Sequence, residues 1–520
     1  MEQFQLTLIL KKITKRKNRF IKCSFKFYDL TIIFAPMIKN TFLLLVALFT
    51  FNSAFSQGYR YEGQVAGLND STCMLAYYYG DKQYARDTAE IDSNGKFVFE
   101  GEEALDHGMY MVVLPDGNYF EVVITEDNFS FSTSKDNLIG GMRFNNSTEN
   151  EKFYGYMQFI SEKQNALKTL QNKKESAPDS EKNSIDQQIK EMGETVMRFQ
   201  EEFTTNNPDL LFAKILLASK EIDIPDNPVG SDGVVDSTFQ FRYYKSHFFD
   251  NLDFSDERML RTPVFHTKIN TYLQNLTAKT PDSLIVSCDY LIEKSRANPK
   301  VFRYLVSYLT STYERSKIMG LEKVFVHLVK KHYATNEVDW IDEVQMFKII
   351  ERAETIEPLM IGSKAPNLIL RDSSNVIHNL HKLTTDLTMV IFYDPDCGHC
   401  KKEIPVIKQN YDEWLKDGIS ISVMAVSVEL DREKWVNFIN TYDIGDWINV
   451  AEFKTFVDGE YNRENDLYVT PFPYIKQLYD INGTPKVYLL DKDKNILVNA
   501  IKGNIGLEQL SELIINESKK

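Results

Sequence analysis

Cysteine and long apolar runs are both scarce in this sequence. The 520 residues include 5 cysteines, whereas small secreted scaffolds held together by disulfides are dense in cysteine. No run reaches the roughly 20 apolar residues that a membrane-spanning helix needs. A cysteine-stapled scaffold and a protein with several membrane spans are therefore not expected, although a buried strand or a membrane anchor at residues 37–56 stays the alternative to an export signal there.

Basic residues are also outnumbered. Lys and Arg total 60 against 74 Asp and Glu, which gives a formal net charge of −14 and a sequence pI near 5.3. Binding to nucleic-acid phosphates depends on clustered Lys and Arg side chains. The one strong basic cluster, at residues 11–19, lies close to the N-terminus, so no nucleic-acid partner is expected.

Residues 37–56 have the pattern of a secretory signal. Lys39 supplies a charged start, the mostly apolar run 42–51 follows, and Ala54 and Ser56 place small residues at alternate positions. These three features in this order are typical of a cleaved export signal. About ten apolar residues are too few to cross a bilayer.

Cleavage is expected between Ser56 and Gln57. Met37 then becomes the natural start, and residues 1–36 form an upstream extension without structure of its own. No cysteine follows the small residues, so a lipid anchor is not expected. The mature protein is expected in the periplasm, without a stable membrane span.

The four cysteines after residue 56 are of two kinds. Cys73 and Cys288 stand alone in separate regions, and we interpret them as small buried apolar side chains. Cys397 and Cys400 form a tight pair. In an oxidising compartment this arrangement indicates redox chemistry rather than a structural disulfide framework.

The length predicts two to four domains, since a domain usually contains about 100 to 200 residues. Residues 57–145 consist of short aromatic and β-branched runs separated by turn signals. The turn sequence at 92–95 predicts a hairpin, and Pro-Asp-Gly at 115–117 separates two further strands. We interpret this region as a small antiparallel β-sandwich.

Residues 146–356 have helical periodicity instead, which predicts an all-α region. Apolar residues three and four apart follow one face on either side of a break at 176–179, so two antiparallel helices are expected, ending at Asn207 and Pro208. The two apolar stripes contain Phe153, Met157, Ile160, Leu167, Ile185, Ile189, Met192, Val196, Phe199 and Phe203.

Residues 357–520 alternate between strand and helix patterns and end in a hairpin and a helix. This order predicts a mixed α/β sheet. The expected strands are 367–370, 388–393, 420–426, 486–490 and 496–500, and the expected helices are 397–415, 431–442, 475–479 and one that begins at Leu507.

Cys397 and Cys400 lie at the start of the expected helix 397–415. Residues three apart on a helix are about one turn from each other, within reach of a disulfide, and the helix N-terminus favours an anion. Cys397 is the predicted nucleophile, and Cys400 would release its mixed disulfide. Gly398 leaves the sulfur approachable, and a protonated His399 would add positive charge beside it.

Thr484 and Pro485, directly before the strand 486–490, form the predicted second half of the site. We expect a cis peptide bond at Pro485, which would bring this backbone beside the cysteines. The groups of Thr484 would then pair with an extended substrate chain.

These motifs resemble the TlpA/ResA-type exported thiol-disulfide oxidoreductases of the thioredoxin superfamily. The resemblance covers about residues 359–518. It rests on the opening motif Gly362-Ser363-Lys364-Ala365-Pro366 and on the active-site helix Cys397-Gly398-His399-Cys400-Lys401-Lys402-Glu403-Ile404-Pro405.

The resemblance implies a thioredoxin-like fold for residues 357–520 that uses no cofactor. It also implies protein thiols and disulfides as substrates, an unidentified redox partner protein and work as a reductase. Glu403 takes the place of a glutamate that helps to move protons at the thiols. The regions before residue 357, including the motif at 254–263, resemble companions of this family in Bacteroidota-type proteins.

Two residues depart from the thioredoxin pattern. Thioredoxin has Trp immediately before its first cysteine and a buried Asp six residues before it, whereas this chain has Asp396 and Ile391. Asp396 is expected to oppose the Cys397 thiolate by like charge. The dipeptide Gly-His is that of protein disulfide isomerase, whose potential lies about 90 mV above that of thioredoxin, so the direction of electron flow stays open.

Two other functions remain open. Cys397, Cys400 and His399 are potential ligands for a metal such as copper. No second cysteine pair occurs, and His378 and His381 are loosely spaced in an expected loop, so no metal site is predicted. Alternatively, the regions before residue 357 make this a binding or assembly protein with an auxiliary redox domain.

Overall fold

The structure is a computed structural model. The predicted upstream extension, export signal and cleavage position lie outside its described residues and stay predictions.

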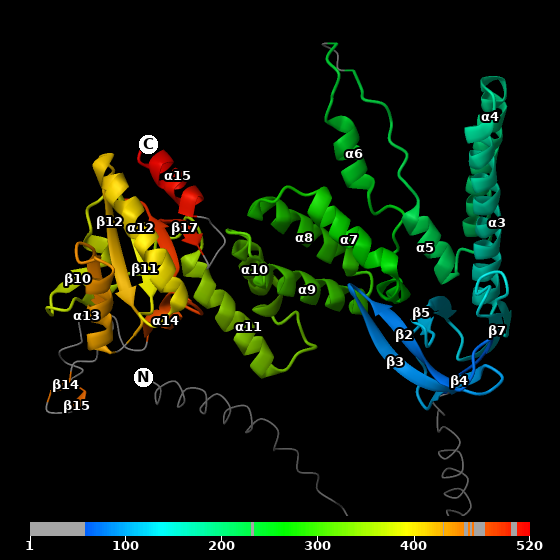
Figure 1. The fold of residues 1–520 in the computed structure, drawn as a ribbon, viewed down its shortest axis with the longest axis horizontal. Coiled ribbons are helices and arrows are strands. Elements are labelled where there is room, and N and C mark those ends of the chain that lie inside the picture. Colours follow the sequence, from blue (N-terminus) through cyan, green and yellow to red (C-terminus); the bar gives the residue numbers. More distant parts are fainter. Residues whose placement is uncertain are drawn as a thin grey trace, which may run out of the picture. The chain divides into compact units, whose positions relative to one another are not determined.

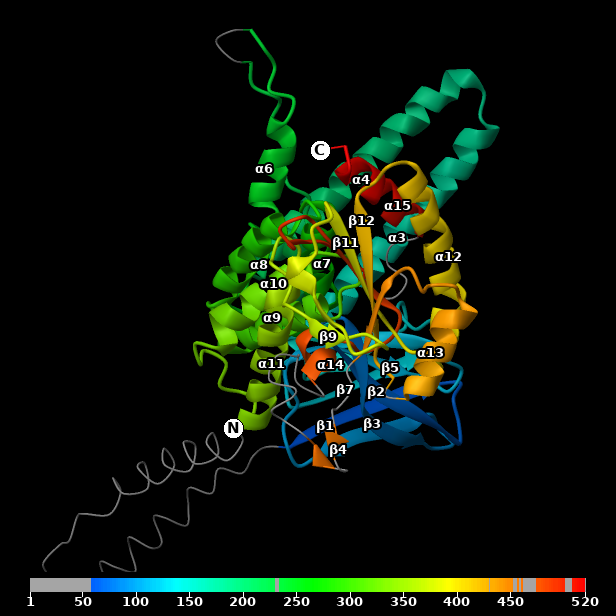
Figure 2. The same ribbon diagram turned by 90° about the vertical axis from the view of Figure 1, so that its left-hand side faces the viewer.

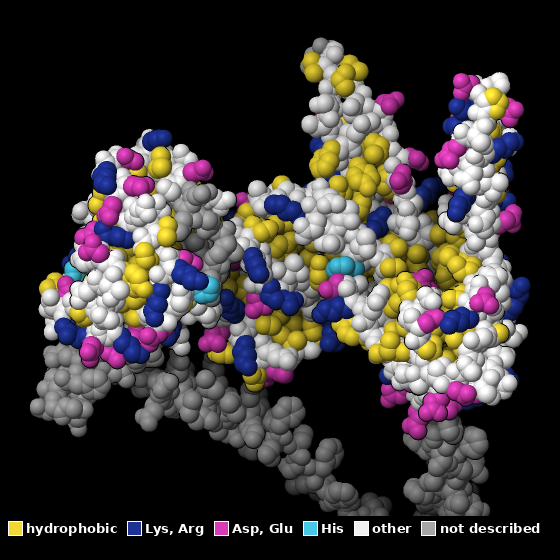
Figure 3. Space-filling model, in the orientation of Figure 1, with side chains coloured by type: hydrophobic (Ala, Val, Ile, Leu, Met, Phe, Trp, Pro, Cys, Tyr) yellow, Lys and Arg dark blue, Asp and Glu magenta, His cyan; other side chains and the backbone are white. Residues whose placement is uncertain are grey.

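None of the described helices combines the length and the apolar character that a membrane crossing requires. On the face shown in Figure 3, basic and acidic side chains are interspersed. The described residues are 58–229, 233–429, 431–451, 456–457, 460–461, 474–500 and 507–519.

Two four-stranded sheets make up the N-terminal part, coloured blue to cyan in Figure 1. Phe131 of one sheet packs on Phe120 of the other, with ring centroids 5.6 Å apart, as in the predicted sandwich. The sheets are not wholly antiparallel, because β1 and β7 run parallel. Their strand orders are β4-β1-β7-β8 and β3-β2-β5-β6, with β1 (Tyr59–Ala66), β2 (Ser71–Tyr79), β3 (Lys82–Ile91), β4 (Lys96–Gly101), β5 (Gly108–Val113), β6 (Tyr119–Ile124), β7 (Asn128–Ser134) and β8 (Arg143–Asn145).

The turn at residues 92–95 does not close a hairpin, contrary to the prediction. The Asp92 carboxylate accepts hydrogen bonds from the backbone N–H groups of Asn94 and Lys96 at 2.8 Å each, so the tight turn itself is present. However, β3 before the turn pairs with β2, and β4 after it pairs with β1 in the other sheet. Local turn chemistry reverses the chain but does not select the partner strand.

Two long helices form the predicted antiparallel hairpin. α3 (Thr148–Ser176) and α4 (Asp179–Asn206) lie side by side in Figures 1 and 2. Ser147 caps α3 by accepting a hydrogen bond from the Asn150 N–H. The helical region continues through α5 (Leu211–Ser219), α6 (Phe239–His247), η1 (Glu257–Arg261), α7 (Pro263–Asn275), α8 (Pro281–Ser295), α9 (Pro299–Glu314), α10 (Glu322–Leu328), η2 (Val329–Tyr333), α11 (Glu343–Ile356) and η3 (Glu357–Leu359).

The N-terminal sheets and the helical region share one apolar core. A continuous cluster of buried side chains includes Phe120 in β6, Phe153 in α3 and Leu305 in α9. The short helix η1 packs on β2 and β5. Residues 58–356 therefore form one packed body, which we call the front region.

The C-terminal region contains a seven-stranded mixed sheet. Its strand order is β10-β9-β13-β12-β11-β16-β17, with β11, β12 and β13 parallel to one another. All seven residues of β11 are buried because helices cover both faces of the sheet. The strands are β9 (Ile369–Arg371), β10 (Ile377–Asn379), β11 (Leu387–Tyr393), β12 (Ile421–Ser427), β13 (Ile448–Ala451), β16 (Lys486–Leu490) and β17 (Ile496–Ala500).

Two cores lie on opposite faces of this sheet. Met389 and Ile391 of β11 pack in a cluster with residues of α12 (Gly398–Lys416), α13 (Arg432–Thr441) and α15 (Leu507–Glu517). Val390 and Phe392 face a second cluster that includes residues of α14 (Tyr474–Leu478) and η3. Figure 2 shows the helices beside the strands. The predicted α/β fold is confirmed.

The expected loop around His378 and His381 was wrong. His378 lies in β10, which pairs with β9, and His381 lies in the short helix η4 (Leu380–Lys382). Three-residue elements give too little alternation to be recognised in a sequence. Both side chains form hydrogen bonds at this edge of the sheet, His378 with the Asp372 carboxylate and His381 with the Ala365 carbonyl oxygen.

Candidate active site

The thiol pair lies where β11 ends and α12 begins. In the connecting turn, the Cys397 N–H donates to the Asp394 carbonyl at 3.0 Å, and Cys397 is the N-cap of α12. Open α/β sheets bind their ligands at the carboxyl ends of parallel strands. The predicted helix start is confirmed within one residue.

The two sulfurs differ in exposure. Cys397 is half-buried, whereas Cys400, one turn further along α12, is completely buried in the apolar cluster on that face of the sheet. Both are free thiols. An incoming disulfide can therefore reach Cys397 but not Cys400.

The two thiols also differ in acidity. Burial raises the pKa of Cys397, but hydrogen bonds from Thr484 and from the backbone N–H groups of Cys400 and His399 outweigh burial, so the pKa lies below its ordinary value. Those N–H groups are the unpaired amides of the first helical turn. The pKa of Cys400 is raised to about 12, chiefly because burial disfavours its thiolate.

Thr484 and Pro485 lie beside the thiols, and the peptide bond between them is cis, as predicted. The Cys397 thiol donates to the Thr484 carbonyl oxygen at 3.3 Å. This contact alone favours the protonated thiol, whereas the Thr484 side chain stabilises the thiolate. The pKa of Cys397 is nevertheless lowered, because the Thr484 side chain and the helix N–H groups all stabilise the thiolate.

The other predicted site residues lie on the first two turns of α12. Gly398 and His399 are exposed, and Glu403 is half-buried. A side-chain carbon at Gly398 would meet no atom within 4 Å, so the glycine leaves open space beside the sulfur. Among the described residues, no hydrogen bond joins the side chain of His399 or Glu403 to a sulfur. His399 acts on Cys397 through its backbone N–H instead.

The like-charge effect expected of Asp396 does not keep the pKa of Cys397 above its ordinary value. The Asp396 carboxylate pairs with Lys434 Nζ of α13 at 2.7 Å, and the ammonium lowers the pKa of Asp396. The neighbouring positive charge offsets the acidic charge beside the thiol. A partner 38 residues away cannot be assigned from the motif alone.

The three potential metal ligands of the thiol loop do not form a compact set. Within the described residues, the one group with ligand atoms all within 4.8 Å of one another consists of three carboxylates, those of Asp394, Asp396 and Glu429. Cys397, Cys400 and His399 are not part of such a group.

Sequence reasoning missed three residues near the site. Trp435 Nε1 donates to the Tyr393 hydroxyl at 3.0 Å in the same core as Cys400, and burial raises the pKa of Tyr393. Lys486, directly after Pro485, is buried, and burial lowers its pKa to about 8. A charged residue opening an apolar strand was the available signal for Lys486.

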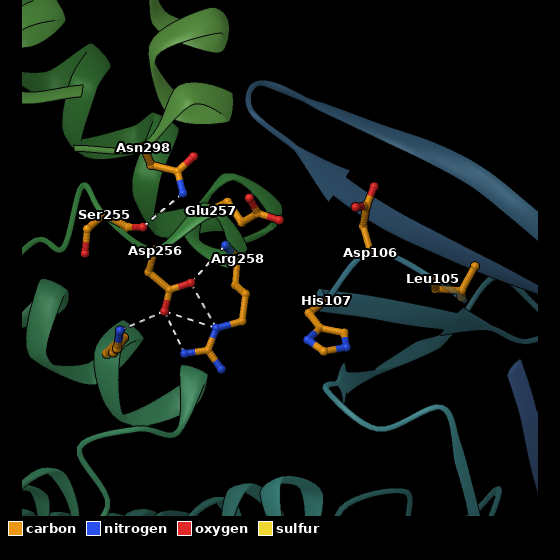
Figure 4. Close-up of a pocket in the computed structure, with 9 residues that line it drawn as sticks. Leu105, Asp106, His107, Ser255, Asp256, Glu257, Arg258 and Asn298 are labelled. Carbon is orange, nitrogen blue, oxygen red and sulfur yellow. Dashed lines mark hydrogen bonds and ion pairs between the residues drawn. The ribbon is translucent and has the colours of Figure 1, made fainter. Parts of the chain in front are cut away.

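A cavity of about 540 Å³, separate from the thiol site, lies in the front region between η1 and the loop that connects β4 and β5 (Figure 4). Asp106 lies on one side, and Asp256 and Arg258 lie on the other. Asp256 accepts hydrogen bonds from Arg258 and from Lys214 Nζ, so these charges pair among themselves. The motif at residues 254–263 thus supplies one wall of a cavity that contains neither of the reactive thiols.

Known families match three parts of the chain. Residues 361–498 match the AhpC/TSA family, and residues 59–153 and 171–356 match two domains of unknown function, DUF4369 and DUF5106. The thiol-disulfide oxidoreductase ResA of Bacillus thuringiensis subsp. konkukian is 25% identical over 160 residues, which are 30% of this chain and 79% of that protein. ResA of Bacillus subtilis is 23% identical over 141 residues, 27% of this chain and 67% of that protein.

Two solved structures are also similar. A domain of a possible thiol-disulfide isomerase from Cytophaga hutchinsonii is 35% identical, with 31% of this chain and 95% of that chain covered and a TM-score of 0.24. A thioredoxin-like protein from Bacteroides caccae is 18% identical, with 57% and 99% covered and a TM-score of 0.41.

The mixed sheet, the CxxC pair at a helix N-terminus and the cis proline beside it define a thioredoxin-like protein-disulfide oxidoreductase. Proteins of this class exchange disulfides through a thiolate and a second, resolving thiol. Over residues 361–498 the chain is similar to the TlpA/ResA-type thiol-disulfide oxidoreductases of the thioredoxin superfamily, and β sheets and a helical region precede this redox domain.

Proposed function

We propose that this protein is an exported reductase that passes two electrons to disulfides of periplasmic proteins through Cys397 and Cys400. The observation that carries the proposal is the unequal pair of thiols. Cys397 is reachable and has a lowered pKa, whereas Cys400 is buried and has a raised pKa. This inequality assigns attack to the first sulfur and resolution to the second.

In the first step, the Cys397 thiolate attacks one sulfur of a substrate disulfide. A bond forms between Cys397 and that sulfur while the substrate S–S bond breaks, and the departing substrate sulfur leaves as a thiolate that takes up a proton. Thr484 lies at the reacting sulfur, where its backbone can pair with an extended substrate. Gly398 leaves the approach open.

In the second step, Cys400 loses its proton and attacks Cys397 Sγ. The mixed disulfide breaks, the second substrate sulfur leaves as a thiol, and a disulfide forms between Cys397 and Cys400. With a pKa of about 12, Cys400 needs a base, and we assign this role to the half-buried Glu403 by family resemblance. A separate redox partner protein then reduces the pair again.

Export is supported by the signal pattern at residues 37–56, and thiol-disulfide exchange by the similarity to ResA proteins. The reductase direction is proposed from the family resemblance of the active-site motif. N-terminal sequencing of the secreted protein should begin at Gln57. The reduction potential of the pair tests the direction, and a value near about −180 mV or above would contradict work as a reductase.

Trapping tests the roles of the two cysteines. The Cys400→Ala variant of the exported protein should accumulate mixed disulfides through Cys397, because the resolving thiol is missing. Non-reducing electrophoresis with mass spectrometry of the cross-linked peptides is the measurement. Cys397→Ala and the buried-site variant Cys288→Ala serve as matched controls. If Cys400→Ala captured no partner, a purely binding or assembly role would be favoured instead.

A further inference from the structure

The cis-proline segment (residues 479–486) is anchored by a buried lysine. Lys486 Nζ donates to the carbonyl oxygen of Tyr479 at 3.1 Å and to that of Asp480 at 2.9 Å. Lys486 is 4% exposed, so water competes little for these hydrogen bonds. One side chain thus ties the end of the segment to its beginning.

A residue of the front region contacts the same anchor. Arg352 lies on α11, the last long helix before the C-terminal sheet (Figure 1), and forms an ion pair with Asp480. The Arg352 side chain is 33% exposed and that of Asp480 is 13% exposed. An ion pair sheltered to this degree is less screened than one on the surface.

The same segment contacts the reacting sulfur. Thr484 accepts a hydrogen bond from Cys397 Sγ at 3.3 Å, and hydrogen bonding from Thr484 contributes to the lowered pKa of Cys397. A contiguous series of contacts therefore runs from Arg352 through Asp480 and the segment to Cys397. Energetic coupling between distant groups is carried by packed and hydrogen-bonded networks of this kind.

Stability alone does not explain a lysine at this place. Burial lowers the pKa of Lys486 to about 8, and an apolar side chain of similar volume would avoid the cost of burying the charge. Glu322 of α10, Arg352 and Lys486 also line one small cavity of about 50 Å³. Two charged side chains of the front region, those of Glu322 and Arg352, thus lie around the same cavity as Asp480 and Lys486 of the cis-proline segment.

We propose that Arg352, Asp480 and Lys486 are positioning residues through which the front region sets the reactivity of Cys397. Arg352 holds Asp480, Lys486 ties both ends of the segment, and the segment presents Thr484 to the sulfur. The inference rests on the thiol chemistry of the proposed function but not on export or on the direction of electron flow.

The test compares Arg352→Gln, Asp480→Asn and the double variant in the reduced, full mature chain. The measurement is the rate of Cys397 alkylation by iodoacetamide against pH, which needs no protein partner. In each single variant the midpoint should move to higher pH, and the rate at neutral pH should fall about threefold or more. The double variant should lose no more than Asp480→Asn alone, because that change breaks the ion pair with Arg352 and also alters the contacts of Asp480 with Lys486 at 3.9 Å and with Asn482 at 2.8 Å.

Arg296→Gln is the matched control, since Arg296 pairs with Glu293 and Glu337 inside the front region. Its alkylation profile should equal that of the parent, and Arg352→Lys should restore part of the lost rate. An unchanged profile in folded Arg352→Gln and Asp480→Asn would overturn the inference. Unfolding of both variants would overturn it as well, because the pair would then support the whole fold. An unreactive Cys397 in the parent would instead refute the proposed function.

Discussion

The front region and the C-terminal region each contain two cysteines, and only one of the four lies at a helix N-terminus. Cys73 in β2 and Cys288 in α8 are buried, and burial raises the pKa of each to about 12, as it does for Cys400. Cys397 alone among them has a lowered pKa. Position at unpaired helix amides, rather than the presence of a thiol, therefore makes a cysteine reactive here.

Selective alkylation is the largest effect expected from this comparison. A pKa raised from the ordinary 9.0 to about 12 lowers the thiolate fraction near neutral pH about a thousandfold. In the reduced native protein, iodoacetamide should therefore modify Cys397 at least about a thousandfold faster than the other three cysteines. Peptide mass spectrometry over a time course at pH 7.5 measures this ratio.

The Cys397→Ser variant is the matched control and should show no fast phase. In denaturant all four thiols should react at similar rates, because burial and the helix amides are then lost. Comparable labelling of Cys73 or Cys288 in the folded protein would contradict the distinction between the two regions.

The redox motif could be predicted from the sequence because its parts are close together along the chain. Spacing placed Cys397 and Cys400 on one helical turn, and the position of Pro485 before a strand indicated the cis bond. The ion pairs around the site join residues 38 and 128 positions apart. No local pattern identifies Lys434 or Arg352 as partners, so the ion pair that offsets the charge of Asp396 was not predicted.

The fold shows the same contrast between features that a local sequence pattern predicts and features that depend on distant partners. Long periodic segments such as α3 and α4 were predicted, whereas β3 was missed because the first five of its residues are exposed and its alternation is weak. Its exposure follows from its place at a sheet edge. The choice of partner for β4 depended on packing against β1, which turn chemistry at residues 92–95 does not encode.

A smaller effect is expected from the ion cluster of the front region. Burial acts to raise the pKa of Asp256, but hydrogen bonds from Arg258 and Lys214 lower it to about 2. The unfolded value is about 3.9, so this carboxylate stabilises the folded state above pH 4, and the stabilisation is lost as pH falls towards 2. Partial solvent screening brings the loss to about 1–2 kcal/mol.

Urea unfolding at pH 6 and pH 3, followed by circular dichroism, measures this change. Asp256→Asn should be less stable than the parent at pH 6, and the gap should narrow at pH 3. Asp186→Asn is the matched control, because Asp186 pairs with Lys174 at the surface. An equal gap at both pH values would mean that Asp256 acts by packing rather than by charge.

The smallest effect concerns one tryptophan in each region. Trp435 is fully buried and donates to Tyr393 at 3.0 Å, whereas the half-buried Trp340 of the front region donates to Ser307 at 3.2 Å. Trp435→Phe should cost about 1–3 kcal/mol, because it leaves a buried hydroxyl without its donor in the core that holds Cys400. Trp340→Phe should cost less, since water can replace the lost partner. Urea unfolding followed by circular dichroism compares the free energies of unfolding of the two variants. Equal losses would show that the buried hydrogen bond near Cys400 contributes no more to stability than the half-buried one in the front region.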